Sequence, residues 1–409
     1  IDYVIEFDRA VFPDADVNTA ITVFEKEPNP ESRRKNLVKF VRVKQRLDMD
    51  ELLNFIRKAT ESIEEDELRM NIVPQSELIP GKWNVYVRAP PVYLKIISSP
   101  VVTPLASLAE VFFGIKTGYN EYFILSKERA EEWNIEKEFL KPVVTSPKKI
   151  RGLVVRPGDV DEYIFLCHKS RTKLRGTRAI QYINFGEKIK VKIERTARPI
   201  EVSLPDVPSV RGRDPWYDLS EYEIPPIIFQ ELYDTQTRAL WNEAGAHARA
   251  PLYYCIPKPE VNAECLVSYL NSSVAQVLFE LYGRSYGGGV LDLKVYELKK
   301  LPVIDTSKLG VDQKNRMIQA FRTLAKAIEE RAKAEDELDR ARAKEQGAKG
   351  LFELEFETKL KEVLDLEEKA RRELDQTVYE ALGLGEDERS QIDKALTELR
   401  EIRRLRREP

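Results

Sequence analysis

The stretch that decides how this sequence folds is Gly114–Phe123, which reads GIKTGYNEYF. Its two glycines stand four residues apart and flank Lys116 and Thr117, and Asn120 follows before an apolar segment. Because glycine adopts backbone conformations that are closed to other residues, this spacing predicts a tightly shaped loop before a strand. Lys116, Thr117 and Asn120 are side chains suited to phosphate or base-edge contacts. A simple bend between two strands explains the same pattern equally well.

Two loops further along the chain combine basic, aromatic and small residues. Residues 211–217 read RGRDPWY, and residues 282–294 read YGRSYGGGVLDLK. Glycines beside arginine, serine and tyrosine let a backbone come close to a polyanion. Each loop alone is a weak signal, and three in this order are more specific. They add these candidate nucleic-acid-contacting residues: Arg213, Trp216, Tyr217, Arg284, Ser285 and Lys294.

The distribution of charge supports the same interpretation. The 409 residues carry a net charge of −3, but residues 148–213 hold sixteen Lys and Arg against seven Asp and Glu. This local balance of +9 leaves −12 for the remainder. An acidic chain with one basic segment is typical of a local surface for a polyanion. A lysine-rich solvated surface is the alternative. The densest part of the segment supplies four more candidates: Lys169, Arg171, Lys173 and Arg175.

Around these loops the apolar periodicity predicts an α+β fold. Residues 48–68 predict a helix that begins at Asp48 or Asp50, and from about residue 71 short strands broken by Pro and Gly indicate a mixed α/β region. Apolar residues at helical spacing then predict one buried helix over 262–282. The expected strands include 3–7, 20–24, 37–43, 84–88, 122–125, 163–166 and 227–229.

The C-terminal third changes to Ala, Glu, Lys, Arg and Leu. Apolar residues recur at helical spacing over 311–345 and 351–382, and the glycine-containing stretch 346–350 separates them. This pattern predicts a helical hairpin, most simply an antiparallel coiled coil, followed by a last charged helix over 386–407. The composition therefore suggests three consecutive domains: 1–70, 71–305 and 306–409.

The sequence also argues against several chemistries. Three cysteines without a CxxC pair and only two histidines do not suggest a zinc site, so we expect no metal. Neither GxGxxG nor GxxxxGK[ST] occurs. The ExK match at 297–299 has Asp292 close in sequence but no strand pair that would bring the groups together, and the match at 357–359 lies in the expected coiled coil, so a metal nuclease site is not expected. Few cysteines and the lack of a long apolar run favour a cytoplasmic protein without membrane contact.

Together these stretches resemble the TaqI-like C-terminal specificity domain of adenine-N6 DNA methyltransferases from restriction–modification systems. In that family a G-I-x-T-G-x-N-x-x-F stretch opens the target recognition domain, and it matches Gly114–Phe123. A basic segment, a Trp-Tyr pair, an Asn-Ser pair on a helix and a glycine-rich stretch before Leu-Pro-Val follow in order. The matching parts of this chain are 148–178, Trp216-Tyr217, Asn271-Ser272 and 287–303. Residues 12–20 and 373–384 also resemble the family, and 85–305 are the strongest part.

One departure from the family decides the expected chemistry. These methyltransferases bind S-adenosylmethionine through a glycine-containing loop and hold the flipped adenine with an (N/D)PP(Y/F) tetrapeptide. Here Ala89-Pro90-Pro91-Val92 and Ile224-Pro225-Pro226-Ile227 have the prolines but lack the Asn or Asp and the aromatic residue. We therefore expect no cofactor in this chain, which alone should be inactive. S-adenosylmethionine should be bound by a catalytic half that lies upstream of Ile1.

The resemblance thus implies a mixed α/β target-recognition domain, a helical hairpin after it, and remnant strands of a methyltransferase fold at the N-terminus. It implies two partners, double-stranded DNA and a methyltransferase catalytic domain or subunit. The leading hypothesis is a specificity part of such a methyltransferase or of a fused restriction–modification enzyme. The alternatives are a stand-alone specificity subunit that recruits catalytic subunits through its coiled coil, and a structural coiled-coil protein with incidental DNA binding.

Overall fold

By its internal contacts the chain divides into two compact units. The first unit combines residues 1–103, 273–292 and 378–409, and the second combines residues 104–272 and 293–377. This grouping differs from the three consecutive domains that the sequence suggests, because the chain leaves the first unit and returns to it twice. The computed structural model describes residues 1–8, 20–45, 47–78, 83–193, 200–220, 222–234, 237–285, 289–344 and 351–405.

A five-stranded sheet with the order β2-β1-β3-β5-β4 organises the first unit. β1 and β3 are parallel, with Tyr3 opposite Lys39, and the other neighbours are antiparallel. Helix α2 buries Leu52 and Ile56 in one cluster with Met70 of the sheet, since these residues follow the helical repeat. The strands are β1 (Tyr3–Phe7), β2 (Ala20–Val23), β3 (Leu37–Val43), β4 (Ile63–Glu64) and β5 (Leu68–Pro74).

Six α-helices and a short hairpin also lie in the described part of the first unit. The helices are α1 (Pro30–Lys35), α2 (Met49–Lys58), α3 (Asn84–Arg88), α4 (Val92–Ser98), α10 (Ser273–Tyr282) and α14 (Glu386–Leu405). The hairpin consists of β19 (Arg284–Ser285) and β20 (Leu291–Asp292). Strand β6 (Val102–Pro104) lies at the boundary between the units.

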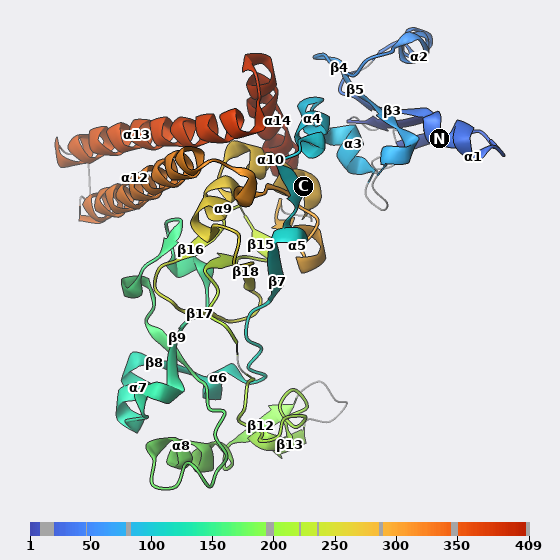
Figure 1. The fold of residues 1–409 in the computed structure, drawn as a ribbon. Coiled ribbons are helices and arrows are strands. Elements are labelled where there is room, and N and C mark those ends of the chain that lie inside the picture. The colour runs from blue at the N-terminus through green and yellow to red at the C-terminus, as the bar shows by residue number, and fades with distance from the viewer. Residues whose placement is uncertain are drawn as a thin grey trace. The chain divides into compact units, whose positions relative to one another are not determined.

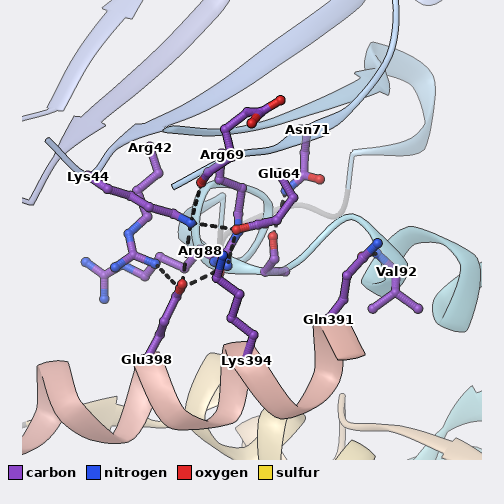
Figure 2. Close-up of polar contacts among 12 residues, drawn as sticks. Arg42, Lys44, Glu64, Arg69, Asn71, Arg88, Val92, Gln391, Lys394 and Glu398 are labelled. Carbon is purple, nitrogen blue, oxygen red and sulfur yellow. Dashed lines mark hydrogen bonds and ion pairs between the residues drawn. The ribbon is translucent and has the colours of Figure 1, made fainter. Parts of the chain in front are cut away.

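The C-terminal helix α14 is tied to the N-terminal sheet by charged side chains (Figure 2). Glu398 accepts hydrogen bonds from Arg69 at 3.0 Å and from Arg42 and Lys44 at 3.4 Å each. Glu64 pairs with both Lys44 and Arg69. Arg69 is 1% exposed, so its charge depends on these carboxylates because a buried unpaired charge is costly.

Two mixed sheets share the core of the second unit. Their strand orders are β10-β16-β14-β18-β7 and β17-β9-β11-β8, and a two-stranded hairpin, β12–β13, is separate. The strands are β7 (Ala109–Phe113), β8 (Ile124–Ser126), β9 (Leu140–Val144), β10 (Val154–Val155), β11 (Glu162–Phe165), β12 (Lys190–Ile193), β13 (Ile200–Ser203), β14 (Ile227–Phe229), β15 (Leu232–Tyr233), β16 (Leu240–Asn242), β17 (His247–Ala248), β18 (Tyr253–Pro257) and β21 (Pro302–Ile304).

Short helices connect these strands, and two long helices follow them. The helices are α5 (Leu105–Leu108), α6 (Asn120–Phe123), α7 (Lys127–Trp133), α8 (Arg178–Gly186), α9 (Ala263–Leu270), α11 (Val295–Leu298), α12 (Val311–Lys344) and α13 (Leu351–Leu382). α12 and α13 lie side by side (Figure 1), and Arg331 of α12 pairs with Glu367 of α13 at 2.9 Å. The mixed helix-and-strand fold with a long helical hairpin is therefore confirmed.

Some local predictions were wrong. Residues 84–88 form helix α3 and not a strand, because buried Asn71 donates to the carbonyls of Tyr86 and Ala89 at 2.7 and 2.8 Å and caps the turn. The helix expected over 48–68 ends at Lys58, since Ile63 pairs with Met70 in the sheet.

Two other elements are divided. The helix expected over 262–282 breaks at Asn271-Ser272 into α9 and α10, and the Asn271 amide donates to the carbonyls of Val267 and Ala239 at 2.9 Å each. The strand expected over 122–125 begins only at Ile124, after the single turn of α6. The break expected at 346–350 and the family-like stretch 12–19 lie outside the described residues.

Candidate nucleic-acid interface

The loop between β7 and α6 is shaped by its two glycines. The Gly114 N–H donates to the Leu252 carbonyl at 2.8 Å, and a Cβ on Gly114 would lie 2.3 Å from the Ala248 carbonyl oxygen. Gly118 has φ +77°, and its Cβ would lie 2.7 Å from the carbonyl oxygen of Ser209. Both positions therefore require glycine, as the spacing predicted.

Thr117 and Asn120 form a polar pair within this loop. The buried Thr117 hydroxyl donates to Asn120 Oδ1 at 2.6 Å. Asn120 is exposed, and this bond fixes which way its amide group faces. Lys116 is also exposed, and its Nζ lies 4.4 Å from the centre of the Phe113 ring. The loop thus presents a cation and an oriented amide, which are suitable groups for a phosphate and a base edge.

Arg213 stabilises the loop through hydrogen bonds to its backbone. Its Nη1 donates to the Thr117 carbonyl at 2.8 Å, its Nη2 donates to the Lys116 carbonyl at 3.0 Å, and its guanidinium lies over the Phe123 ring. Burial lowers the pKa of the Arg213 guanidinium from its ordinary value. The side chain that the sequence suggests for base contact is therefore engaged with the protein backbone.

Trp216 and Tyr217 belong to an aromatic cluster under the loop. The Trp216 ring lies 5.2 Å from Tyr122, and the Tyr122 ring stacks on Tyr182 at 4.6 Å. Tyr217 is 0% exposed, and its hydroxyl donates to the Lys169 carbonyl at 3.0 Å. Gly186 faces Trp216 and Tyr122, where an added Cβ would lie 2.6 Å from each ring. These contacts give Trp216 and Tyr217 a packing role.

The basic segment contains residues with carboxylate partners and residues without them. Lys169 pairs with Glu138 at 2.7 Å, and Arg171 pairs with Glu187. Lys173 and Arg175 are exposed, and neither has an ion-pair partner among the described residues. Helix α12 also neutralises part of the segment through its contacts with Arg151 and Arg156: Arg151 with Glu335 and Asp336, and Arg156 with Glu329.

Sequence reasoning missed one set of basic residues, Lys188, Lys190 and Lys192. All three are exposed, at and beside β12, while Ile189, Val191 and Ile193 between and after them are partly buried. No ion pair to these lysines occurs among the described residues. The alternation KIKVK was the available signal, because residues two apart share one face of a strand.

The remaining candidates are Arg284, Ser285 and Lys294. Arg284 is exposed in β19 and Ser285 follows it in the same strand, both in the first unit. Lys294 belongs to the second unit, where its ammonium pairs with Glu231. The structure therefore brings together the candidates of the loops 114–120, 169–175 and 213–217.

Residues 88–340, more than half of the chain, match the family described as the C-terminal domain of type II methyltransferase M.Eco57I. The chain belongs to this family. Its resemblance to the specificity region of restriction–modification methyltransferases is thereby confirmed. Type II methyltransferase M.AccI of Acinetobacter calcoaceticus is 25% identical to it over 333 residues, which are 78% of this chain and 56% of that protein.

Among solved structures, the type IIG restriction endonuclease BpuSI superposes with a TM-score of 0.44 at 14% identity, over 93% of this chain and 43% of that one. The chain therefore spans about half the length of the relatives that it matches.

The segments that follow the parallel strands β1 and β3 contain no glycine in their sequence, so they do not match the glycine-containing loop of these methyltransferases. No group of His, Cys, Asp and Glu in the described ranges is arranged to hold a metal ion. Within those ranges no helix is both long and apolar enough to cross a membrane.

Proposed function

We propose that this chain provides sequence-specific recognition of double-stranded DNA for an adenine-N6 DNA methyltransferase or a fused restriction–modification enzyme. The observation that carries the proposal is the loop 114–120, in which two required glycines and Arg213 fix the backbone behind Lys116 and Asn120. Base recognition needs a few polar groups in fixed positions. A loop that is already ordered before it binds avoids the entropic cost of becoming ordered on DNA.

Asn120 is the strongest candidate for reading a base. An asparagine amide bonds adenine bidentately by donating to N7 and accepting from N6. The Thr117 hydroxyl occupies one lone pair of Asn120 Oδ1 and leaves the second lone pair and both N–H groups for such a contact. Lys116 beside it is suited to a phosphate.

The exposed cations without carboxylate partners extend this surface over the same unit. Lys173, Arg175, Lys188, Lys190 and Lys192 present charge that no described carboxylate neutralises. Such residues favour a polyanion more than Lys169 and Arg171, which must first release Glu138 and Glu187. Trp216, Tyr217 and Arg213 support the loop in this proposal and do not touch bases.

The direct test is a binding selection on randomised duplex DNA with the 409-residue chain. The proposal predicts one enriched sequence, and Asn120→Ala relaxes it at one position with about a 5- to 150-fold loss for the preferred duplex. Thr117→Val, which removes the hydroxyl that orients the amide, relaxes the same position to a smaller extent. No enriched sequence for the unchanged chain would rule the proposal out.

The salt dependence of binding tests the phosphate contacts separately. Replacing Lys188, Lys190 and Lys192 by Gln should reduce the slope of log K against log salt by about 0.9 for each phosphate that is no longer neutralised, on every DNA sequence. Arg151→Gln, which removes one cation that pairs with α12, should leave the slope unchanged and serves as the matched control. Equal slopes for the triple variant and the unchanged chain would exclude β12 from the interface.

The catalytic half and its cofactor are a further part of the proposal. Strand β2 ends the N-terminal sheet and all four of its residues are exposed, so the sheet has an edge that can accept another strand. A methyltransferase catalytic domain that binds S-adenosylmethionine is the proposed partner. The chain alone should transfer no labelled methyl group to DNA, and transfer by the pure chain would contradict this assignment.

A further inference from the structure

The last helix of the chain holds the glycine-rich stretch that contains Arg284. Both lie in the first unit, where α14 packs along α10. Arg403 of α14 donates from Nη1 to the carbonyl oxygen of Gly289 at 2.8 Å. The sequence separates these two residues by more than a hundred positions, so the contact is a tertiary one.

The contact between Arg403 and Gly289 is supported by a buried ion pair between Arg403 and Glu280. The Nε and Nη2 of Arg403 donate to the two carboxylate oxygens of Glu280 at 3.0 Å each, and the two side chains are 6% and 5% exposed. A bidentate pair of this kind fixes the plane of the guanidinium, and the third donor then meets Gly289. Burial raises the pKa of the Glu280 carboxyl, while Arg403 opposes that rise.

Gly289 lies in the connection between β19, which carries Arg284, and β20, two residues before Leu291. Arg284 pairs with Asp292 and Ser285 with Leu291 in the β19–β20 ladder. Gly283 packs so closely that a Cβ would lie 2.6 Å from Leu291 Cδ1, and Gly289 has φ +69°. The two strands thus form a stem, fixed on one side by Gly283 and on the other by Arg403, and Arg284 is exposed on it.

We infer that Arg403 is a positioning residue for DNA specificity, which acts by fixing the stem that carries Arg284. The inference rests on the proposed function and extends it to Arg284, which the sequence offers as a residue for reading guanine. Arg403 itself is 5% exposed and does not reach DNA. Its effect is therefore on the choice of base and not on general affinity.

A double-mutant cycle in the full 409-residue chain tests this coupling. Arg284→Ala, Arg403→Ala and the double variant are each subjected to selection on randomised duplex DNA, with binding measured on the preferred and on a scrambled duplex. We expect both single variants to relax the same base position by about tenfold, the double variant to lose no more, and the scrambled duplex to bind as before. Additive losses, an unchanged preference in Arg403→Ala, or equal loss on both duplexes would overturn the inference.

Two further variants separate positioning from folding. Glu398→Gln weakens a different attachment of α14, the one to the N-terminal sheet, and should keep the preferred sequence. The exchange Glu280→Arg with Arg403→Glu keeps an ion pair but removes the donor to Gly289, so it should fold and still lose the preference. Retention of the preference by a folded exchange variant overturns the inference. An unchanged chain with no preference overturns the proposed function and this inference together.

Discussion

Two glycine-containing loops, one in each unit, are each held by an arginine side chain that donates to backbone carbonyls. Arg213 donates to the carbonyls of Lys116 and Thr117 in the second unit, and Arg403 donates to the carbonyl of Gly289 in the first. The two arginines differ in their acidic partners, since Arg403 also pairs with buried Glu280. No carboxylate pairs with Arg213 among the described residues. A loop backbone can thus be fixed by arginine with or without a paired acid, and the two arrangements should respond differently to mutation.

The largest decrease in the free energy of unfolding is expected for Arg403→Ala. Removal of this side chain leaves Glu280 buried without its partner, which should destabilise the first unit by about 3–5 kcal/mol. Without Arg403 the pKa of Glu280 rises further above its unfolded value, so the variant loses stability as pH increases above about 4.5 and recovers part of it below. Denaturant unfolding at several pH values measures this. An equal loss at pH 4.5 and pH 8 would show that the charge of Glu280 is not the cause.

A smaller effect is expected for Arg213→Ala. Two charge-assisted bonds to the backbone are removed, at a cost of about 1.5–3 kcal/mol to the second unit. Because no carboxylate is left unpaired, this loss should be the same from pH 4.5 to pH 8. The same unfolding series provides the measurement, with Arg211→Ala, an exposed neighbour, as the control. A loss that varies with pH as in Arg403→Ala would remove the distinction between the two loops.

The smallest effect is expected for Gly118→Ala. The positive φ of this residue costs a residue with a side chain about 1–2 kcal/mol. The added methyl group also has to displace the Ser209 carbonyl. Gly176→Ala is a matched control, because Gly176 has φ +82° but no atom near its Cβ position. The difference in unfolding free energy between the two variants measures the cost of the contact between the new methyl group and the Ser209 carbonyl. Equal losses in the two variants would show that the loop accommodates this contact without cost.

The sequence predicted the parts of this molecule whose signal is local. The alternation of residues 37–43 and the helical repeats of 311–345 and 351–382 correspond to β3, α12 and α13. The glycine spacing of the loop 114–118 was likewise sufficient, because positive φ and close approach demand glycine.

What the sequence did not reveal depends on distant partners. Val85-Tyr86-Val87 has the composition of a strand, but Asn71, from β5, caps it as a helix. Arg213 looks like a base reader in the sequence, while its partners are carbonyls 96 and 97 residues away. Tyr217 looks like a stacking group and is buried. Pattern alone does not distinguish an arginine or tyrosine that supports a loop from one that contacts a ligand.

The return of α14 to the N-terminal sheet sets an order of events during synthesis. Arg69 is buried against Glu398, which is translated 329 residues later. At about 5–20 residues per second the ribosome needs roughly 16–66 s to reach that glutamate. Residues 104–377, which form the second unit apart from residues 273–292, have been synthesised before then. The nascent chain can therefore complete the loop at 114–120 first, and the first unit, with the Gly289 contact, closes only after α14 has been synthesised.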